Sequence, residues 1–155
     1  MRDGGDTLRA IRKMMNTLQE EVATNHRTIG AKRILVVEDE KGVRETLKMI
    51  LRLDGHSVAE AANGREACLL FAPGDFDLVI TDYAMPEMKG DELARTIKCL
   101  VPSQPILMLT AFPGQVEGEN PVDAILEKPF ELATLRAKIA SLLQMAGVQN
   151  SSSAR

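Results

Sequence analysis

The sequence is poor in cysteine, has no long apolar run and carries no strong charge of either sign. Its 155 residues include two cysteines, Cys68 and Cys99, which stand apart without metal or redox spacing. No stretch of about 18 apolar residues is available to span a membrane, and residues 1–30 lack the apolar core of a secretory signal. The formal net charge of −3 provides no global field that attracts nucleic acid. We therefore expect a cytoplasmic protein, bound neither to membrane nor to nucleic acid, whose partners are proteins or small ions.

The apolar residues that are present suffice for one globular domain, since they make up 45% of a chain of single-domain length. Beyond the N-terminal segment, short β-like runs alternate with helix-like stretches, which is typical of βαβ units and a parallel sheet. Residues 33–37, 77–81 and 106–110 are almost continuously apolar, as central strands covered on both faces should be. Residues 57–61 alternate and predict an edge strand, and residues 124–126 predict a brief last strand. The predicted strand order is 2-1-3-4-5.

Four helices are predicted between and after these strands. They cover residues 43–51, 63–71, 91–100 and 131–145, with Asn63 as the N-cap of the second. The crossover between the fourth and fifth strands is different, because two prolines and two glycines in residues 113–121 leave room for barely one helical turn. We expect that crossover to be mostly loop, with its helix shortened or missing.

Both ends lie outside this pattern. Within residues 1–31, apolar side chains at 3-4-3-4 spacing predict an amphipathic helix: Leu8, Ile11, Met15, Leu18 and Val22. Such a helix could pack on its own domain or act as a linker, or it could dock on a partner or form a homodimer. Residues 32–146 are the predicted domain. Residues 147–155 are polar, and we expect a disordered tail too short for a further domain.

Polar residues that suit chemistry fall at the ends of the predicted strands. Glu38 and Asp39 follow the first strand, Asp82 follows the third, Thr110 ends the fourth and Lys128 follows the fifth. The carboxyl ends of parallel strands share one edge, and open α/β sheets bind ligands there, where the strand order reverses. Three neighbouring acids need either a raised pKa or a cation among them, and Mg²⁺ suits such carboxylates. Asp82 could then act as a nucleophile towards a phosphoryl group, whose charge Lys128 and Thr110 would stabilise.

The same residues lie in motifs that resemble those of response-regulator receiver domains. The resemblance extends over about residues 32–145, and four motifs carry it in the family's order: ILVVEDE, DYAMPEMKG from Asp82 to Gly90, Leu109-Thr110-Ala111 and Lys128-Pro129-Phe130. It implies a flavodoxin-like α/β fold, with a doubly wound five-stranded parallel sheet. It also implies a switch in two-component signalling or a phosphorelay, which is not an enzyme beyond turnover of its own phosphoryl group.

The resemblance assigns roles to the acids. Asp82 would be phosphorylated by the phosphohistidine of a sensor histidine kinase or a histidine phosphotransfer protein. Glu38, Asp39 and Asp82 would hold Mg²⁺ or Mn²⁺, together with the backbone carbonyl of Ala84.

The resemblance also implies roles for the residues that follow the last two strands. Lys128 would contact the phosphoryl group, and Thr110 would swing towards it. The Lys128–Pro129 peptide bond would be cis, which X-Pro bonds permit at modest cost.

The sequence departs from the family pattern in two places. Ile125 stands where receivers usually carry the aromatic residue that turns inward on activation, and the segment between Thr110 and Lys128 is shorter than usual. The sequence therefore leaves open whether the family's usual output surface, which is formed by helix 4, strand 5 and helix 5, is used here. We also expect Phe112 and Ala84, which flank the path of a hydrolytic water to the acyl phosphate, to slow autodephosphorylation.

Three other functions compete with this interpretation. A pseudo-receiver would fold alike without being phosphorylated, but the complete polar set argues against it. A phosphatase that works through an aspartyl phosphate would carry a second acid at position 84, where this chain has Ala84. A DNA-binding regulator would need a basic helix-turn-helix, for which neither end has room. The sequence leaves open whether the chain is a single-domain regulator or the receiver part of a hybrid kinase, and which protein lies downstream.

Overall fold

The structure, a computed structural model, describes residues 8–17, 30–116 and 121–152, without the side chains of 147–152. The chain divides into two compact units, Met1–Gly30 and Ala31–Arg155. In the first unit, residues 8–17 form a helix, and its apolar side chains Leu8, Ile11 and Met15 are exposed. The rest of the predicted apolar seam lies outside the described residues. No helix in the described ranges is long and apolar enough to cross a membrane.

The second unit is built on one five-stranded parallel sheet, and its strand order β2-β1-β3-β4-β5 confirms the predicted one. The strands are β1 (Arg33–Val37), β2 (Ser57–Ala61), β3 (Leu78–Asp82), β4 (Ile106–Thr110) and β5 (Ala124–Glu127). Strands β1, β3 and β4 are almost wholly buried, whereas β2 is half-buried at one edge. The order reverses between β1 and β3, so that the polar residues after these strands lie side by side.

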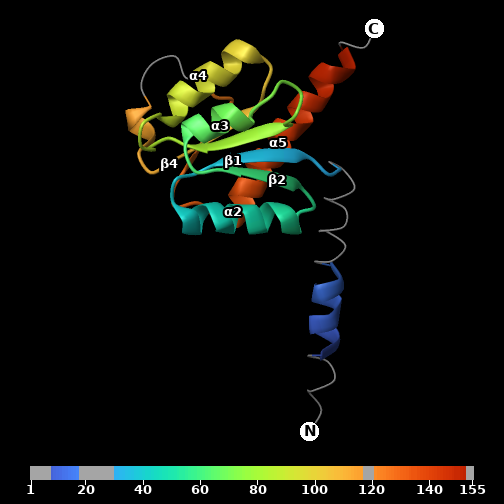
Figure 1. Cartoon of the computed structure of the whole chain (residues 1–155). Coiled ribbons are helices and arrows are strands. Elements are labelled where there is room, and N and C mark those ends of the chain that lie inside the picture. Colours follow the sequence, from blue (N-terminus) through green and yellow to red (C-terminus); the bar gives the residue numbers. More distant parts are fainter. Residues whose placement is uncertain (1–7, 18–29, 117–120, 153–155) are drawn as a thin grey trace. The chain divides into compact units, whose positions relative to one another are not determined.

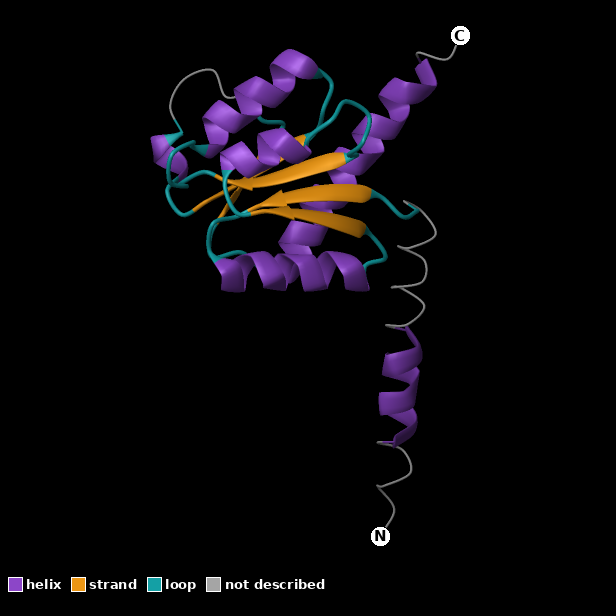
Figure 2. Ribbon diagram, viewed as in Figure 1, coloured by secondary structure: helices purple, strands orange, loops and turns teal. Residues whose placement is uncertain are grey.

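Helices cover both faces of the sheet. They are α2 (Lys41–Leu53), α3 (Gly64–Leu70), α4 (Gly90–Leu100) and α5 (Leu132–Ser152). Helices α2 and α5 lie on one face, and α3 and α4 lie on the other (Figures 1 and 2). Asn63 caps α3 as predicted: its side chain accepts a hydrogen bond from Glu66 N at 2.8 Å, while the Glu66 carboxylate accepts one from Ala62 N.

Helix α5 continues to Ser152, past its predicted end at Met145. The predicted end of this helix is therefore too early, whereas the boundary drawn for a disordered tail at residues 147–155 stays a prediction, and residues 153–155 lie outside the described part. The physical reason is that no proline interrupts the helix there. Gly147 costs only about 1 kcal/mol relative to alanine in a helix, which is too little to end one.

One part of the core lies between the sheet and helices α3 and α4. Its members include apolar residues of β1, β3 and β4 and the inward faces of both helices: Leu35, Val37, Val79, Ile106, Leu93 and Ile97. On the other face, Arg136 of α5 pairs with Asp54 at the end of α2 through two contacts of 2.8 Å. This packing on both faces fixes the strands, and with them the edge at which the polar residues meet.

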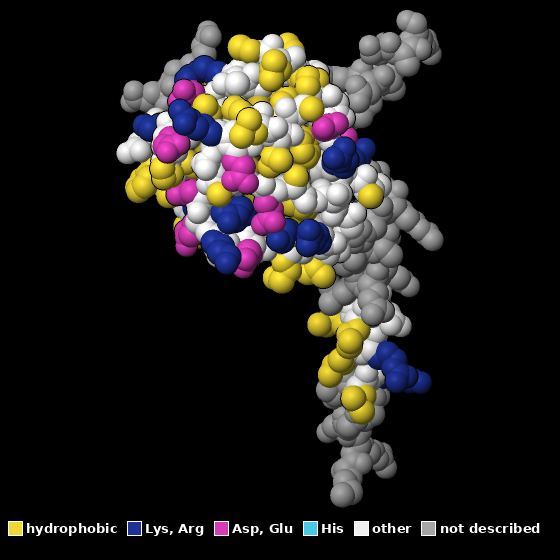
Figure 3. Space-filling model, in the orientation of Figure 1, with side chains coloured by type: hydrophobic (Ala, Val, Ile, Leu, Met, Phe, Trp, Pro, Cys, Tyr) yellow, Lys and Arg dark blue, Asp and Glu magenta, His cyan; other side chains and the backbone are white. Residues whose placement is uncertain are grey.

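The crossover between β4 and β5 is short, as predicted. Within its described residues, the helical segment is a single 3₁₀ turn, η1 (Pro113–Gln115); residues 117–120 lie outside the description. Asp123 closes the crossover, because its carboxylate accepts hydrogen bonds from Ile106 N and Lys98 Nζ, both at 2.8 Å. On the face of the domain shown in Figure 3, basic and acidic side chains are interspersed.

Candidate functional site

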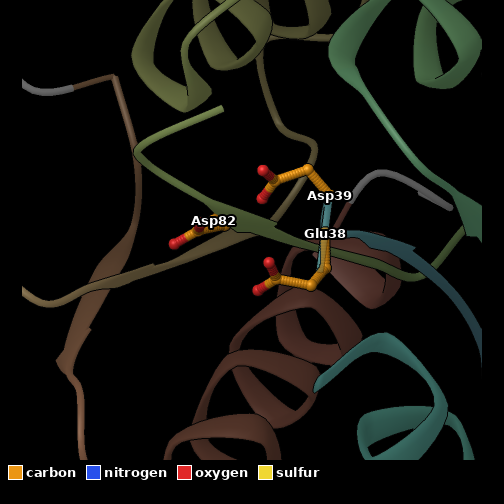
Figure 4. A group of neighbouring side chains, drawn as sticks. All are labelled: Glu38, Asp39 and Asp82. Carbon is orange, nitrogen blue, oxygen red and sulfur yellow. The ribbon is translucent and has the colours of Figure 1, made fainter. Parts of the chain in front are cut away.

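Three carboxylates converge at the carboxyl edge of the sheet. Glu38 and Asp39 follow β1, and Asp82 is the last residue of β3. Figure 4 shows the three side chains directed to the same side, and one ligand oxygen from each lies within 4.8 Å of the others. Glu38 and Asp82 are buried, whereas Asp39 is exposed. The structure thus brings these acids together, as the strand order requires.

Lys128 reaches the two buried acids from the end of β5. Its Nζ donates a hydrogen bond to Glu38 Oε2 at 2.9 Å and lies 3.2 Å from Asp82 Oδ1. The backbone places it there, since Lys128 N donates to the carbonyl of Thr110 at 2.8 Å and so joins the ends of β4 and β5. The Lys128–Pro129 bond is cis, which confirms the prediction.

Burial dominates the electrostatics of this group. Desolvation raises the pKa of Glu38 and that of Asp82, and it outweighs the opposing contacts with Lys128. For Lys128, burial lowers the pKa, but the hydrogen bonds and charges of Glu38 and Asp82 together raise it above its usual value. Three carboxylates and one ammonium group leave a surplus of negative charge when the acids are ionised, and a further cation would be favoured there.

The donor set fits a small hard cation. Carboxylate oxygens are the ligands that Mg²⁺ prefers. One oxygen from each of the three acids lies within 4.8 Å of the others, so that Glu38, Asp39 and Asp82 would together hold one such ion. Ala84, exposed in the loop after β3, was predicted to add its carbonyl, and that role stays a prediction.

Thr110 is buried at the end of β4, and its hydroxyl oxygen contacts the loop that follows. Its Oγ1 accepts a hydrogen bond from Phe112 N at 3.0 Å. The Phe112 side chain is exposed, and Ile125 is half-buried in β5 in register with Met108. The predicted roles of Thr110, Phe112 and Ile125 in switching and phosphate loss stay predictions.

Gly90 determines how the loop after Asp82 packs. A Cβ atom at this position would collide with the backbone carbonyl oxygen of Asp82 and lie 3.0 Å from Tyr83 Cα. The Gly90 N–H donates to the Tyr83 carbonyl at 2.9 Å, and the Tyr83 N–H donates to the Leu109 carbonyl at 2.9 Å. The glycine that ends the DYAMPEMKG motif therefore allows α4 to begin directly against the site.

Sequence reasoning missed two residues around the site. Arg44 of α2 donates from Nη1 to the backbone carbonyl of Glu38 at 2.7 Å. Tyr83 donates its hydroxyl to the carbonyl of Gln115 at 3.2 Å, which connects the loop after β3 to η1. Each contact joins a side chain to a main-chain oxygen of another segment, and no short-range pattern marks such a pair.

Comparison with known proteins identifies the family. The sequence pattern of the response regulator receiver domain matches residues 34–140. The chain belongs to this family. Receiver domains are signalling switches of two-component systems, and they receive phosphoryl groups from histidine kinases.

Individual relatives agree with this assignment. The response regulator MprA of Mycolicibacterium vanbaalenii is 40% identical over 116 residues, which are 72% of this chain and 50% of that protein. The response regulator TrrA of Thermotoga maritima, solved with Mg²⁺-BeF, is 37% identical with a TM-score of 0.67, over 72% of this chain and 98% of that one. The receiver domain of a Syntrophus aciditrophicus signal transduction histidine kinase is 34% identical with a TM-score of 0.67, and the match covers 73% of this chain and 90% of that one. This receiver domain spans about half the length of the curated relatives it matches.

Proposed function

We propose that this receiver domain accepts a phosphoryl group on Asp82, with Mg²⁺ or Mn²⁺, from the phosphohistidine of a sensor histidine kinase or a histidine phosphotransfer protein. The observation that supports this most directly is the placement of Lys128 against both Glu38 and Asp82. A cation held in that position balances the acids at rest and can turn to a phosphoryl oxygen. Asp39 completes an oxygen cluster of the kind that holds a divalent ion.

In the transfer, a carboxylate oxygen of Asp82 attacks the phosphorus atom and the phosphorus–nitrogen bond to the donor histidine breaks. The histidine leaves with the electron pair of that bond. Glu38, Asp39, Asp82 and the Ala84 carbonyl would hold the metal, which supplies charge neutralisation when bound. Lys128 would transfer one hydrogen bond from the carboxylates to the phosphoryl group.

Thr110 would carry the change into the loop that follows β4. When its hydroxyl turns to the phosphoryl group, it gives up the hydrogen bond from Phe112 N, and the segment that begins there is released. Because Ile125 offers no aromatic ring to turn inward, this segment is the route by which a protein partner would sense the state of the site. Phe112 and Ala84 would slow autodephosphorylation, so that the signal persists.

The structure of this one domain is compatible with two contexts. It could act as a single-domain regulator in the cytoplasm, or as the receiver part of a hybrid kinase, since one relative at 34% identity is a histidine kinase receiver. In either context the domain would be a switch, and its catalysis would be limited to its own phosphoryl transfer and hydrolysis. Homodimer formation through residues 8–17 stays a proposal for the first unit.

Phosphorylation by acetyl phosphate tests the proposal. Intact mass is measured for the full chain with Mg²⁺ and with a chelator, for the wild type, for Asp82→Ala and for Asp75→Ala. Asp75 is the matched control, because its carboxylate is half-exposed beside Arg33 and belongs to no part of the site. We expect one Mg²⁺-dependent phosphoryl group in the wild type and in Asp75→Ala, and none in Asp82→Ala. No gain in folded wild-type protein would favour the pseudo-receiver alternative.

A further inference from the structure

We infer that Arg44 is a positioning residue that fixes the direction of Asp39 and thereby sets the affinity of the site for Mg²⁺. The inference rests on the proposed function, because it concerns the same metal site. It begins from the 2.7 Å hydrogen bond that Arg44 Nη1 donates to the backbone carbonyl of Glu38. That oxygen belongs to the peptide unit that leads directly into Asp39.

The backbone of Glu38 is held on both sides. Its N–H donates to the carbonyl of Ala61 in the neighbouring strand at 3.1 Å, while its own carbonyl accepts from Arg44. Since a peptide unit is planar, holding the Glu38 oxygen also orients the nitrogen of Asp39. These two hydrogen bonds hold the peptide planes on either side of Glu38, and the second plane contains the Cα atom from which the Asp39 side chain leaves the backbone.

Asp39 needs such control more than the other two acids do. Glu38 is buried and is tied to Lys128 through its side chain, and Asp82 is built into β3. Asp39 is exposed, and the negative charges of its neighbours favour turning its carboxylate out to water. A backbone that already directs Asp39 towards the other two acids reduces the cost of gathering three like charges around an ion.

Arg44 is itself held in place by the edge strand. Its Nε lies 3.8 Å from Oε1 of Glu60 in β2, and Lys48 donates to Oε2 of the same carboxylate at 2.7 Å. The Arg44 side chain is only 17% exposed, so its guanidinium has little freedom to turn elsewhere. Guanidinium presents several N–H groups in a rigid plane, which lets one side chain face Glu60 and the Glu38 carbonyl together.

If Arg44 only stabilised the contact between α2 and the end of β1, replacing it would lower the stability of the fold and leave the Mg²⁺ affinity unchanged. Arg136 provides the comparison for that role. It forms two contacts of 2.8 Å with Asp54 at the other end of α2. The thirteen residues of α2 span about 20 Å, so the Arg136 pair lies well away from the carboxylates.

The test measures Mg²⁺ binding to the full chain by titration calorimetry, with tyrosine fluorescence as a second readout. The chain has one tyrosine and no tryptophan, and Tyr83 directly follows Asp82, so the signal reports on this site. We expect Arg44→Met to raise the Kd for Mg²⁺ about tenfold, as the loss of a supporting residue around metal ligands typically does. Arg136→Met lowers the urea midpoint but leaves the Kd as in the wild type, and Arg44→Lys restores part of the affinity.

A wild-type Kd in folded Arg44→Met overturns the inference. If Arg44→Met does not fold, Glu60→Gln tests the same contact from its other partner, and Glu45→Gln on the exposed side of α2 is the control for the lost charge. Glu60→Gln must then raise the Kd more than Glu45→Gln does, and equal values overturn the inference. Wild-type chain that neither binds Mg²⁺ nor is phosphorylated overturns the proposed function itself, which distinguishes the two failures.

Discussion

The Nζ atom of Lys128 lies 2.9 Å from Oε2 of Glu38, so that a lysine that follows β5 neutralises a buried acid that follows β1. The same Nζ lies 3.2 Å from Asp82. Removing this ammonium leaves two buried carboxylates without their cation. We expect Lys128→Met to lower the free energy of unfolding by about 2 kcal/mol in a chelator. Mg²⁺ should recover most of that loss, because it takes over the neutralisation.

Urea unfolding with and without Mg²⁺ measures this effect, with Arg136→Met as the control. Arg136→Met also loses an ion pair, but a half-exposed one whose loss costs about 1 kcal/mol or less. Mg²⁺ should stabilise Arg136→Met by as much as the wild type and Lys128→Met by more. Equal stabilisation of all three proteins would contradict the role assigned to Lys128.

The contact between Gly90 and the carbonyl of Asp82 makes a second prediction. Gly90→Ala forces the start of α4 away from the loop after β3, and overpacking of this kind typically costs about 1 to 3 kcal/mol. Gly42→Ala in α2 is the matched control, since a Cβ there meets nothing within 4 Å and alanine favours a helix by roughly 0.5 to 1 kcal/mol. Thermal unfolding should show a lower melting temperature for Gly90→Ala and a higher one for Gly42→Ala than for the wild type. An unchanged melting temperature in Gly90→Ala would mean that the loop after β3 moves at little energetic cost.

The raised pKa values predict a pH dependence of the metal-free protein. Burial lifts the pKa of Asp82 above 3.8 and that of Glu38 above 4.5 in the folded state. A carboxyl shifted in this direction stabilises the fold fully below its unfolded-state pKa, and that contribution is lost as the pH rises through its folded-state pKa. Near neutral pH both ionised groups therefore act against folding when no metal is bound.

Asp82→Asn removes one of these charges. We expect it to raise the free energy of unfolding by about 1 kcal/mol at neutral pH in a chelator, as relief of a strained functional site commonly does. The gain should shrink as the pH is lowered, because burial raises the pKa of Asp82 and the wild-type carboxyl takes up its proton at a higher pH than an ordinary aspartate does. Asp75→Asn at a half-exposed position serves as the control and should show no comparable gain. A gain that is independent of pH would rule out charge as its cause.

The sheet and the position of the site could be predicted from the sequence, whereas the contacts that hold the site could not. Apolar runs and polar strand ends are local features, and parallel topology brings the ends of β1 and β3 together, so the proximity of Glu38, Asp39 and Asp82 could be predicted. Arg44 was missed because its partner is a backbone oxygen, and every residue has one, so that the sequence does not indicate the contact. The resting partner of the Thr110 hydroxyl depends on the course of the loop after β4, which the sequence pattern leaves open.

The exposed ring of Phe112 leads to a prediction about the lifetime of the phosphorylated state. Phe112 is 61% exposed and lies two residues beyond Thr110, while Ala84 on the opposite loop is also exposed and apolar. Neither side chain can orient a water molecule for attack on an acyl phosphate. A carboxylate in place of the ring can accept a hydrogen bond from that water, so we expect Phe112→Glu to speed phosphate loss severalfold.

Leu69→Glu on α3, at a position that is 88% exposed, controls for the added charge and should leave the rate unchanged. The measurement follows the phosphorylated mass after the phosphodonor is removed, and an unchanged or slower rate in Phe112→Glu would show that water reaches Asp82 by another path.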